Sequence, residues 1–305
     1  MIRPLPPALQ EIAEKELNEK PDRIEADILA LRGWLAKQPH LQAVKPSDQL
    51  LIAFLRGNKH SLERSKEKLD MFYTLRSVVP EIYNHRNPFD PALQEFLKLG
   101  ILLPIRREGF GTIVLTRFAL FDPSQHKLVD FIKLVFMTME ILMLEDDSYL
   151  ICGEHALTDM DGVGIGIFLQ WTPALAKKTV LSVEKSLPLR LKDNYILVPQ
   201  ASSAFEAAFN LVKTLLSEKL KKRIHIITKK EVVCDVLAKK NVTSRLRWPS
   251  LKEISASWKD KVESYKDWFL QQAEERSDES RRPGVPKTSS TLFGVEGSFR
   301  KLQVD

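Results

Sequence analysis

The sequence predicts an α/β fold in three layers around a mainly parallel sheet, preceded by an all-α module. Three observations support this prediction. Apolar residues recur at helical spacing across residues 8–79, strand-like and helix-like segments alternate over residues 112–228, and residues 187–228 form a well-delimited strand–helix–strand unit. Strands that alternate with helices form mainly parallel sheets with right-handed crossovers, so the second region is expected to contain such a sheet.

Composition and charge limit the classes of function. Of the 305 residues, 44% are hydrophobic and 28% are charged, which is ordinary for a globular protein. The net charge of +6 favours an anionic partner such as a membrane, a nucleic acid or an acidic protein. No apolar run reaches the roughly 18 residues of a membrane span, and no apolar signal segment is apparent. We therefore expect a soluble, cytoplasmic protein with peripheral membrane contact, in which Cys152 and Cys234 stay reduced.

The N-terminal module is expected to occupy residues 1–90 and to consist of antiparallel helices. Helices are predicted over residues 8–19 and 22–37, and each stops at a proline, which cannot continue a helix. A third helix is expected after Ser47, whose hydroxyl can cap it, and a fourth after Ser61. The connections are short and polar, which is typical of a helical bundle.

Residues 91–240 are expected to form the second domain, which contains the sheet. Its strands are predicted where β-branched and apolar residues cluster, at residues 112–118, 149–159, 191–198 and 224–228. Its helices are predicted from apolar stripes and capping residues, at residues 90–99, 130–144, 172–187, 201–220 and 231–239.

The helix within residues 187–228 has two possible roles. Ser202 or Ser203 is expected to cap it, with Glu206 as a capping-box partner. One face is apolar, and the end of the segment is basic, with Lys219, Lys221, Lys222 and Arg223. A core helix with a solvated tip is the plainer interpretation of this pattern. A mobile helix that covers an apolar cavity, beside a patch that attracts anionic lipid, is the more specific one.

Residues 241–275 are expected to form a C-terminal extension with an amphipathic helix at 257–275. Residues 276–305 are rich in Ser, Arg, Pro and Gly, which predicts an extended or disordered tail. Phe293 and Phe299 are candidates for tethering this tail to the body of the protein.

No motif for catalysis, nucleotide binding or metal binding stands out. The segment at 161–166, DGVGIG, lacks the third glycine of a dinucleotide fingerprint, and neither a Walker loop nor a GxSxG elbow occurs. The 6 histidines show no HxxxH pairing, so zinc is not expected. The acidic residues at 145–147 fit a solvated helix end, and His155 fits a core histidine better than a cavity group. The sequence therefore predicts neither an enzyme nor a bound cofactor.

Short segments along the chain resemble the CRAL-TRIO lipid-binding family, and its α-tocopherol transfer protein branch most closely. They follow the family's order over roughly residues 20–235: DQLLIAFLR at 48–56, FDP at 121–123, TDMDG at 158–162, TP at 172–173, LPLR at 187–190 and KTLLSEKL at 213–220. The segment that begins DESRRPG also resembles insect members. The order and spacing of these segments together are specific to the family, although each segment alone is short.

This resemblance implies that the sheet forms the floor of one apolar cavity, with residues 201–216 as a movable lid. It implies that one hydrophobic molecule, of tocopherol, retinoid or phospholipid type, is bound there and exchanged at membranes without chemical change. The residues expected around this cargo are Phe131, Val135, Met139, Ile151, Phe168, Val198, Phe205, Phe209 and Val212. A basic cleft beside the lid is implied to bind phosphoinositide headgroups at Arg190, Lys192, Lys219 and Arg223.

The sequence also departs from the family's pattern. Asn58 stands at the second arginine of the family's FLRAR motif, two residues after the segment at 48–56. SRLRWP at 244–249 stands near the place of the family's LP-x-EYGG. Val135 and Met139 stand near serines of the tocopherol-type cavity, so a more apolar cavity and a different cargo are expected.

Other classes of function stay open at this point. In one alternative the protein is a lipid-regulated adaptor, whose helical module or tail binds an unknown partner protein. An enzyme acting on lipid esters would need a nucleophile that the sequence does not identify. Nucleic-acid binding is not expected, because the basic residues interleave with apolar positions and no known module is present.

Overall fold

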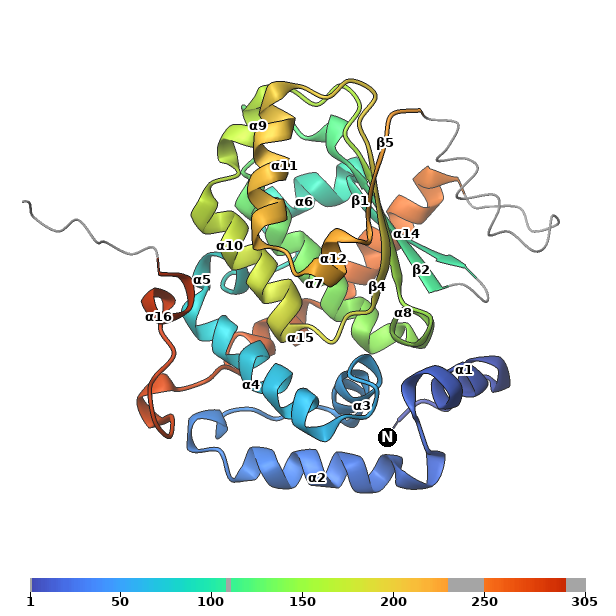
Figure 1. The fold of residues 1–305 in the computed structure, drawn as a ribbon, viewed down its shortest axis with the longest axis vertical. Coiled ribbons are helices and arrows are strands. Elements are labelled where there is room, and N and C mark those ends of the chain that lie inside the picture. The colour runs from blue at the N-terminus through green and yellow to red at the C-terminus, as the bar shows by residue number, and fades with distance from the viewer. Residues whose placement is uncertain (1, 108–110, 230–249, 295–305) are drawn as a thin grey trace, which may run out of the picture.

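The computed structural model describes residues 2–107, 111–229 and 250–294. Figure 1 shows a sheet beside a group of helices, with the N-terminal helices gathered at one end of the molecule. Four sequence predictions fall outside the described residues, namely the helix at 231–239, the role of the segment at 244–249, the state of Cys234 and the tether at Phe299.

The N-terminal part of the chain is helical, as predicted. Its helices are α1 (Pro7–Leu17), α2 (Ile24–Ala36), α3 (Asp48–Gly57), α4 (Leu62–Val78), α5 (Pro80–Tyr83) and α6 (Pro91–Leu99). Ser47 caps α3 as predicted, because its hydroxyl oxygen accepts a hydrogen bond from the Leu50 amide at 3.2 Å. Gly100 has a left-handed backbone, with φ of 59°, and ends α6 directly after residue 99, the predicted limit of this helix.

The sheet has five strands in the order β1-β2-β3-β4-β5. They are β1 (Leu102–Arg107), β2 (Gly111–Arg117), β3 (Glu154–Asp159), β4 (Leu191–Leu197) and β5 (Ile224–Ile227). β1 is antiparallel to β2, and all other neighbours are parallel. The predicted fold class is therefore confirmed. Sequence reasoning missed β1 because Pro104 interrupts its apolar run, but proline is tolerated on an edge strand, which β1 is.

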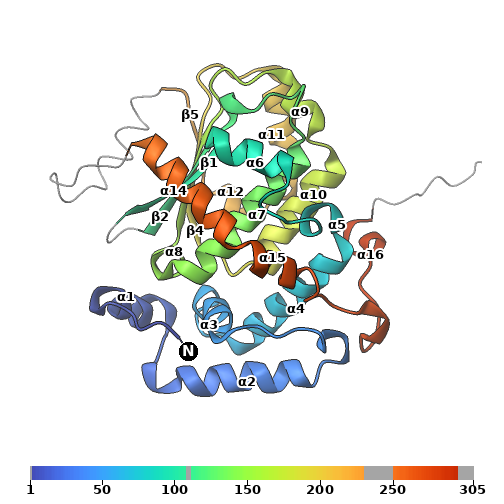
Figure 2. The same ribbon diagram turned by 180° about the vertical axis from the view of Figure 1, so that it is seen from behind.

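Further helices surround the sheet. They are α7 (Leu128–Glu145), α8 (Asp147–Ile151), α9 (Ile165–Gln170), α10 (Pro173–Leu181), α11 (Ser203–Leu215), α12 (Glu218–Lys221), α14 (Leu251–Ser264), α15 (Lys266–Gln272) and α16 (Ser289–Phe293). Figure 1 shows α9, α10 and α11 together on one side of the sheet, where α11 contacts both of the others. The view from behind shows α14 beside β1, which it contacts (Figure 2).

The predicted strand at 149–159 is wrong in its first half. Residues 147–151 form helix α8, and the strand begins only at Glu154. The cause is Asp146, whose carboxylate accepts hydrogen bonds from the amides of Ser148 and Tyr149 and so caps a helix. An apolar run of this length is compatible with either element, and the cap decides the outcome here.

Two predicted helices have different limits in the structure. The helix predicted at 172–187 stops being α-helical at Leu181 and closes with a π-helical turn at Ser182–Ser186. The helix predicted at 257–275 begins earlier, because Ser250 forms a capping box, and it is divided into α14 and α15 at Tyr265.

Residues 276–294 are folded against the N-terminal helices, which corrects the prediction of an extended or disordered tail. Arg282 pairs with Asp70 of α4 at 2.9 Å. Phe293 of α16 is 2% exposed and packs on the main hydrophobic core, so it anchors this segment. Composition alone predicted disorder for this segment. The residues that hold it in place, such as Asp70, are distant in the sequence, so no local pattern reveals these contacts.

A buried ionic cluster ties the N-terminal helices to the part that contains the sheet. Arg56 of α3 donates to Glu19 at 2.8 Å and to Asp147 of α8 at 2.9 Å. Burial raises the pKa of Glu19, but hydrogen bonds from His60 and Arg56 outweigh burial and lower this pKa to about 2. One hydrophobic core also contains residues of both parts, so they pack as a single body.

Candidate functional site

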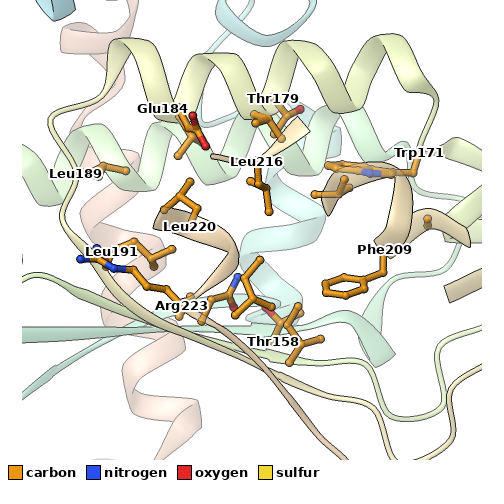
Figure 3. Close-up of a pocket in the computed structure, with 18 of the residues that line it drawn as sticks. Thr158, Trp171, Thr179, Glu184, Leu189, Leu191, Phe209, Leu216, Leu220 and Arg223 are labelled. Carbon is orange, nitrogen blue, oxygen red and sulfur yellow. Dashed lines mark hydrogen bonds between the residues drawn. The ribbon is translucent and has the colours of Figure 1, made fainter. Parts of the chain in front are cut away.

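A cavity of about 500 Å³ lies between the sheet and helices α10, α11 and α12. Figure 3 shows Thr158 on the side of the sheet and Thr179 of α10 on the opposite wall, with Leu216 and Leu220 between them. Most of the lining residues are apolar. Its size and lining are typical of a pocket for a small hydrophobic molecule.

The floor of the cavity consists of alternate residues of β3 and β4. Successive side chains of a strand point to opposite faces, and Glu154, Ala156 and Thr158 of β3 are the ones that line the cavity. From β4, Asn194 and Ile196 do so. Ala156 pairs with Asn194 and Thr158 pairs with Ile196, so these side chains form adjacent rows on one face of the sheet.

The opposite wall includes the apolar face of α11. Phe205, Phe209 and Val212 line the cavity at helical spacing. The rings of Phe205 and Phe209 are stacked with centroids 5.7 Å apart, and Phe168 of α9 meets Phe205 edge-on at 6.1 Å. Ser202 caps α11 by accepting a hydrogen bond from the Phe205 amide at 3.1 Å. Of the two serines predicted as possible caps, Ser202 is the one that caps α11.

Two polar groups in the floor were missed by sequence reasoning. The Tyr149 hydroxyl donates to Glu154 Oε2 at 2.8 Å, and burial raises the pKa of Glu154 to about 7. Burial also raises the pKa of Tyr149 well above its usual value. Asn194 Oδ1 is buried and has no hydrogen-bond partner among the described residues. From Val135 and Met139, which stand near serines of the tocopherol-type cavity, we expected a more apolar cavity. Glu154 and Asn194 instead make its floor partly polar.

Family models match two parts of the chain. Residues 111–246 match the CRAL/TRIO domain, and residues 20–93 match the Pinta-like UBA domain. Residues 111–246 therefore form a CRAL/TRIO domain. The resemblance stated from the sequence is thereby confirmed, and the cavity described above lies almost wholly within the matched CRAL/TRIO domain.

Individual relatives agree with this assignment. The human "Alpha-tocopherol transfer protein-like" is 27% identical over 216 residues, which are 70% of this chain and 62% of the relative. Clavesin-1 of Xenopus laevis is 23% identical over 224 residues, which are 73% of this chain and 67% of that protein. The match thus spans 62% of the length of the human relative. The crystal structure of Sfh5 covers 86% of this chain and 99% of its own, with 13% identity and a TM-score of 0.46.

The CRAL/TRIO cavity includes several of the residues expected around the cargo, namely Met139, Phe168, Phe205, Phe209 and Val212. Phe131 and Val135 do not line it, and Phe131 instead packs against Phe118 with ring centroids 4.9 Å apart. Helix α7 is apolar on most of its surface, so helical spacing alone could not show which face borders the cavity.

Ile151 and Val198 also lie away from the cavity wall. Ile151 belongs to α8 and packs against Ala13 and Leu17 of α1, because its segment is a helix and not a strand. Val198 follows the end of β4, where its amide donates to the carbonyl of Ile227 at 2.8 Å. Both side chains are buried, but in other parts of the core.

Basic residues gather at one end of the CRAL/TRIO cavity. Lys68, Lys219 and Arg223 all line it. Burial lowers the pKa of Lys68 to about 8, and the charge of Lys219 acts in the same direction. Burial also lowers the pKa of Lys219, together with the charges of Arg223, Lys59 and Arg64. The last two belong to the N-terminal helical part, and sequence reasoning did not select them.

Arg190 and Lys192, the other two residues of the predicted basic cleft, contact an acidic partner. Glu16 of α1 accepts from Arg190 at 2.9 Å and from Lys192 at 3.5 Å. Arg190 also donates to the backbone carbonyl of Ile151. Asn58 serves a structural purpose, since its amide donates to the Phe54 carbonyl at 2.8 Å. The predicted cleft is thus divided between cavity-lining cations and cations held by α1.

The described part of the chain has no helix that is long and apolar enough to cross a membrane. Within the same residues, no group of three or more His, Cys, Asp or Glu side chains is placed to hold a metal ion.

Proposed function

We propose that this protein binds one hydrophobic small molecule between its sheet and helix α11 and transfers it between membranes. The observation that supports this most strongly is the cavity of about 500 Å³ with a mainly apolar lining. A tocopherol-like molecule is one candidate, because a relative is named alpha-tocopherol transfer protein-like. Because the lining is mainly apolar, we propose a carrier and not an enzyme.

Burial of apolar surface supplies the affinity. At about 25 cal/mol per Å², a ligand that buries roughly 400 Å² gains on the order of 10 kcal/mol before the costs of association. Such a ligand leaves readily only for another apolar environment, and a membrane provides one. Transfer therefore requires that the cavity open against a lipid surface, and α11 is the element whose apolar face would be uncovered.

Helix α9 offers the apolar contact with the membrane. Its residues Ile165 and Leu169 are 62% and 73% exposed, although both side chains are large and apolar. α9 packs against α11, so a lipid surface that takes up α9 would meet the proposed lid as well. The basic residues Lys59, Lys219 and Arg223 lie beside the same cavity and would attract anionic headgroups, those of phosphatidylinositol phosphates included.

The double substitution Ile165→Ser and Leu169→Ser is expected to slow transfer of a fluorescent tocopherol analogue between donor and acceptor vesicles at least about tenfold. The apolar anchor is lost, whereas the cavity is intact, so the equilibrium affinity for the analogue should be retained. Both quantities follow from the same fluorescence assay, run with and without acceptor vesicles.

The matched control is the double substitution Leu29→Ser and Val285→Ser, because these residues are 61% and 79% exposed but lie on α2 and on the segment before α16. It should transfer the analogue at the rate of the unmodified protein. Equal slowing in both double variants would contradict the role of α9. Absence of binding by the unmodified protein, with tocopherol, retinoid and phospholipid probes alike, would contradict the proposed function itself.

Substitution Glu16→Gln is expected to strengthen binding to vesicles that contain phosphatidylinositol phosphates about fivefold. It removes the carboxylate that now pairs with Arg190 and Lys192, and one basic residue near an anionic surface contributes about 1 kcal/mol. Vesicle sedimentation at fixed ionic strength measures the effect.

Glu11→Gln is the matched control, because Glu11 lies on the same helix but pairs with Lys15 at 2.5 Å. This control should bind vesicles as the unmodified protein does. If Glu16→Gln has no effect, or if both variants gain equally, Glu16 does not compete with lipid for the basic cleft. A lipid-regulated adaptor stays the alternative prediction. A partner protein that residues 1–90 or 276–305 of the intact chain retain when the lid is mutated would favour it.

A further inference from the structure

The floor of the cavity contains a pair of polar groups that an entirely apolar ligand would leave unsatisfied. Asn194 Oδ1 is buried without a hydrogen-bond partner among the described residues. Glu154 is 4% exposed, and Tyr149 donates to one of its carboxyl oxygens at 2.8 Å. Both residues line the cavity. Buried polar groups in folded proteins are nearly always paired, so an unpaired one calls for an explanation.

Strand pairing brings these two groups to the same part of the floor. Asn194 of β4 pairs with Ala156 of β3, and Glu154 stands two residues before Ala156. Glu154 itself pairs with Leu191, because the register between β3 and β4 shifts directly after Glu154. Glu154, Leu191 and Asn194 all line the cavity, so Glu154 and Asn194 lie near each other on one face of the sheet. On the other side of Asn194, its pairing partner on β5 is the apolar residue Ile224, which also lines the cavity.

Two effects act on the pKa of the Glu154 carboxyl. Burial raises it to about 7, and the hydrogen bond from the Tyr149 hydroxyl lowers it by less. A carboxyl in such surroundings is largely neutral below neutral pH and can then donate a hydrogen bond as well as accept one.

We propose that Glu154 and Asn194 form a subsite for the hydroxyl group of an otherwise apolar ligand, so that the cargo belongs to the lipophilic alcohols. This inference rests on the proposed function and makes its ligand class more specific. A hydroxyl group donates one hydrogen bond and accepts another, which satisfies the Asn194 amide in either orientation and leaves a partner for Glu154. Esters and ethers only accept, and a hydrocarbon does neither.

The test compares each alcohol with its own methyl ether, which removes the donor and adds one methyl group; the variants below separate the two effects. The probes are retinol with retinyl methyl ether and α-tocopherol with its methyl ether, and binding is followed by ligand or tryptophan fluorescence. Two pairs are needed because their shapes differ. In at least one pair, the unmodified protein is expected to bind the alcohol about tenfold more tightly than the ether, because a site built to pair with a hydroxyl discriminates against analogues that lack it.

The variant Asn194→Leu should reduce this preference to less than about twofold, mainly by binding the ether better, since the unpaired amide is gone. The variant Thr116→Val is the control: Thr116 lies on the neighbouring strand β2 and does not line the cavity, so its replacement should leave the preference intact. Denaturation midpoints of both variants establish that they are folded.

The outcomes separate this inference from the proposed function. If the unmodified protein binds alcohol and ether equally in both pairs, a water molecule or nothing pairs with Asn194, and the hydroxyl subsite is refuted while the carrier function stands. If the preference persists in Asn194→Leu, the subsite lies elsewhere and the assignment is refuted. If neither member of either pair binds, and phospholipid and hydrocarbon probes do not bind either, the proposed function fails.

Discussion

Substitution Glu140→Gln is expected to lower the free energy of unfolding by about 3–5 kcal/mol, the usual cost of removing one member of a buried ion pair. Glu140 of α7 is 1% exposed and accepts from Arg76 at 3.0 Å and from Arg86 at 2.8 Å. Glutamine preserves the shape but leaves two buried guanidinium groups without a counter-charge. Burial already lowers the pKa of Arg86, which indicates how costly its charge is at this site. Urea denaturation measures the change.

Thr138→Val is the control for this substitution. Thr138 lies on the same helix and is 1% exposed, but its hydroxyl has no partner among the described residues. Removing an unpaired hydroxyl should leave stability unchanged or raise it slightly. If Glu140→Gln lowers the free energy of unfolding by less than about 1 kcal/mol, water reaches the cluster. The ion pair between α4 and α7 would then contribute little to stability.

Substitution Ala208→Trp is expected to weaken cargo binding about tenfold to a hundredfold. Ala208 lies on α11 and lines the cavity beside Phe205 and Phe209. An indole at this position would fill space that the ligand needs, within a cavity of only about 500 Å³. Fluorescence titration with the tocopherol analogue measures the loss. Ala208 is half-buried, so the side chain can be accommodated without unfolding the protein.

Ala207→Trp is the matched control, because Ala207 is exposed on the same helix and does not line the cavity. It adds the same bulk and the same fluorophore but should bind the analogue with unchanged affinity. Equal weakening in both variants would show that the effect acts through the stability of α11 and not through occupied volume.

Much of the fold was predictable because its signals are local. Ser47 and Gly100 mark helix ends through their own chemistry, and the apolar stripe of α11 is visible in the sequence alone. Where local signals were ambiguous the prediction failed. The segment at 147–151 is compatible with a strand or a helix, and the cap at Asp146 decides for the helix.

The site was predicted less completely, since its geometry depends on long-range pairing. Glu154 lines the cavity with alternate residues of β3. The predicted strand began at residue 149 and assigned Ile151 to the cavity, and strict alternation from Ile151 places Glu154 on the other face. The pairing of Arg190 with Glu16 joins residues separated by 174 positions, and no local pattern reveals it. Positions on the largely buried helix α7 were assigned to the cavity from a pattern that fits several faces equally well.

Native mass spectrometry after exposure to a total lipid extract shows whether the cavity under α11 holds a ligand. We expect one lipophilic molecule per chain, which organic extraction then identifies. The molecule should be retained by Ala207→Trp and lost from Ala208→Trp. A protein that stays empty in every extract, or an adduct that both variants keep equally, would contradict the claim that the cavity under α11 carries the cargo.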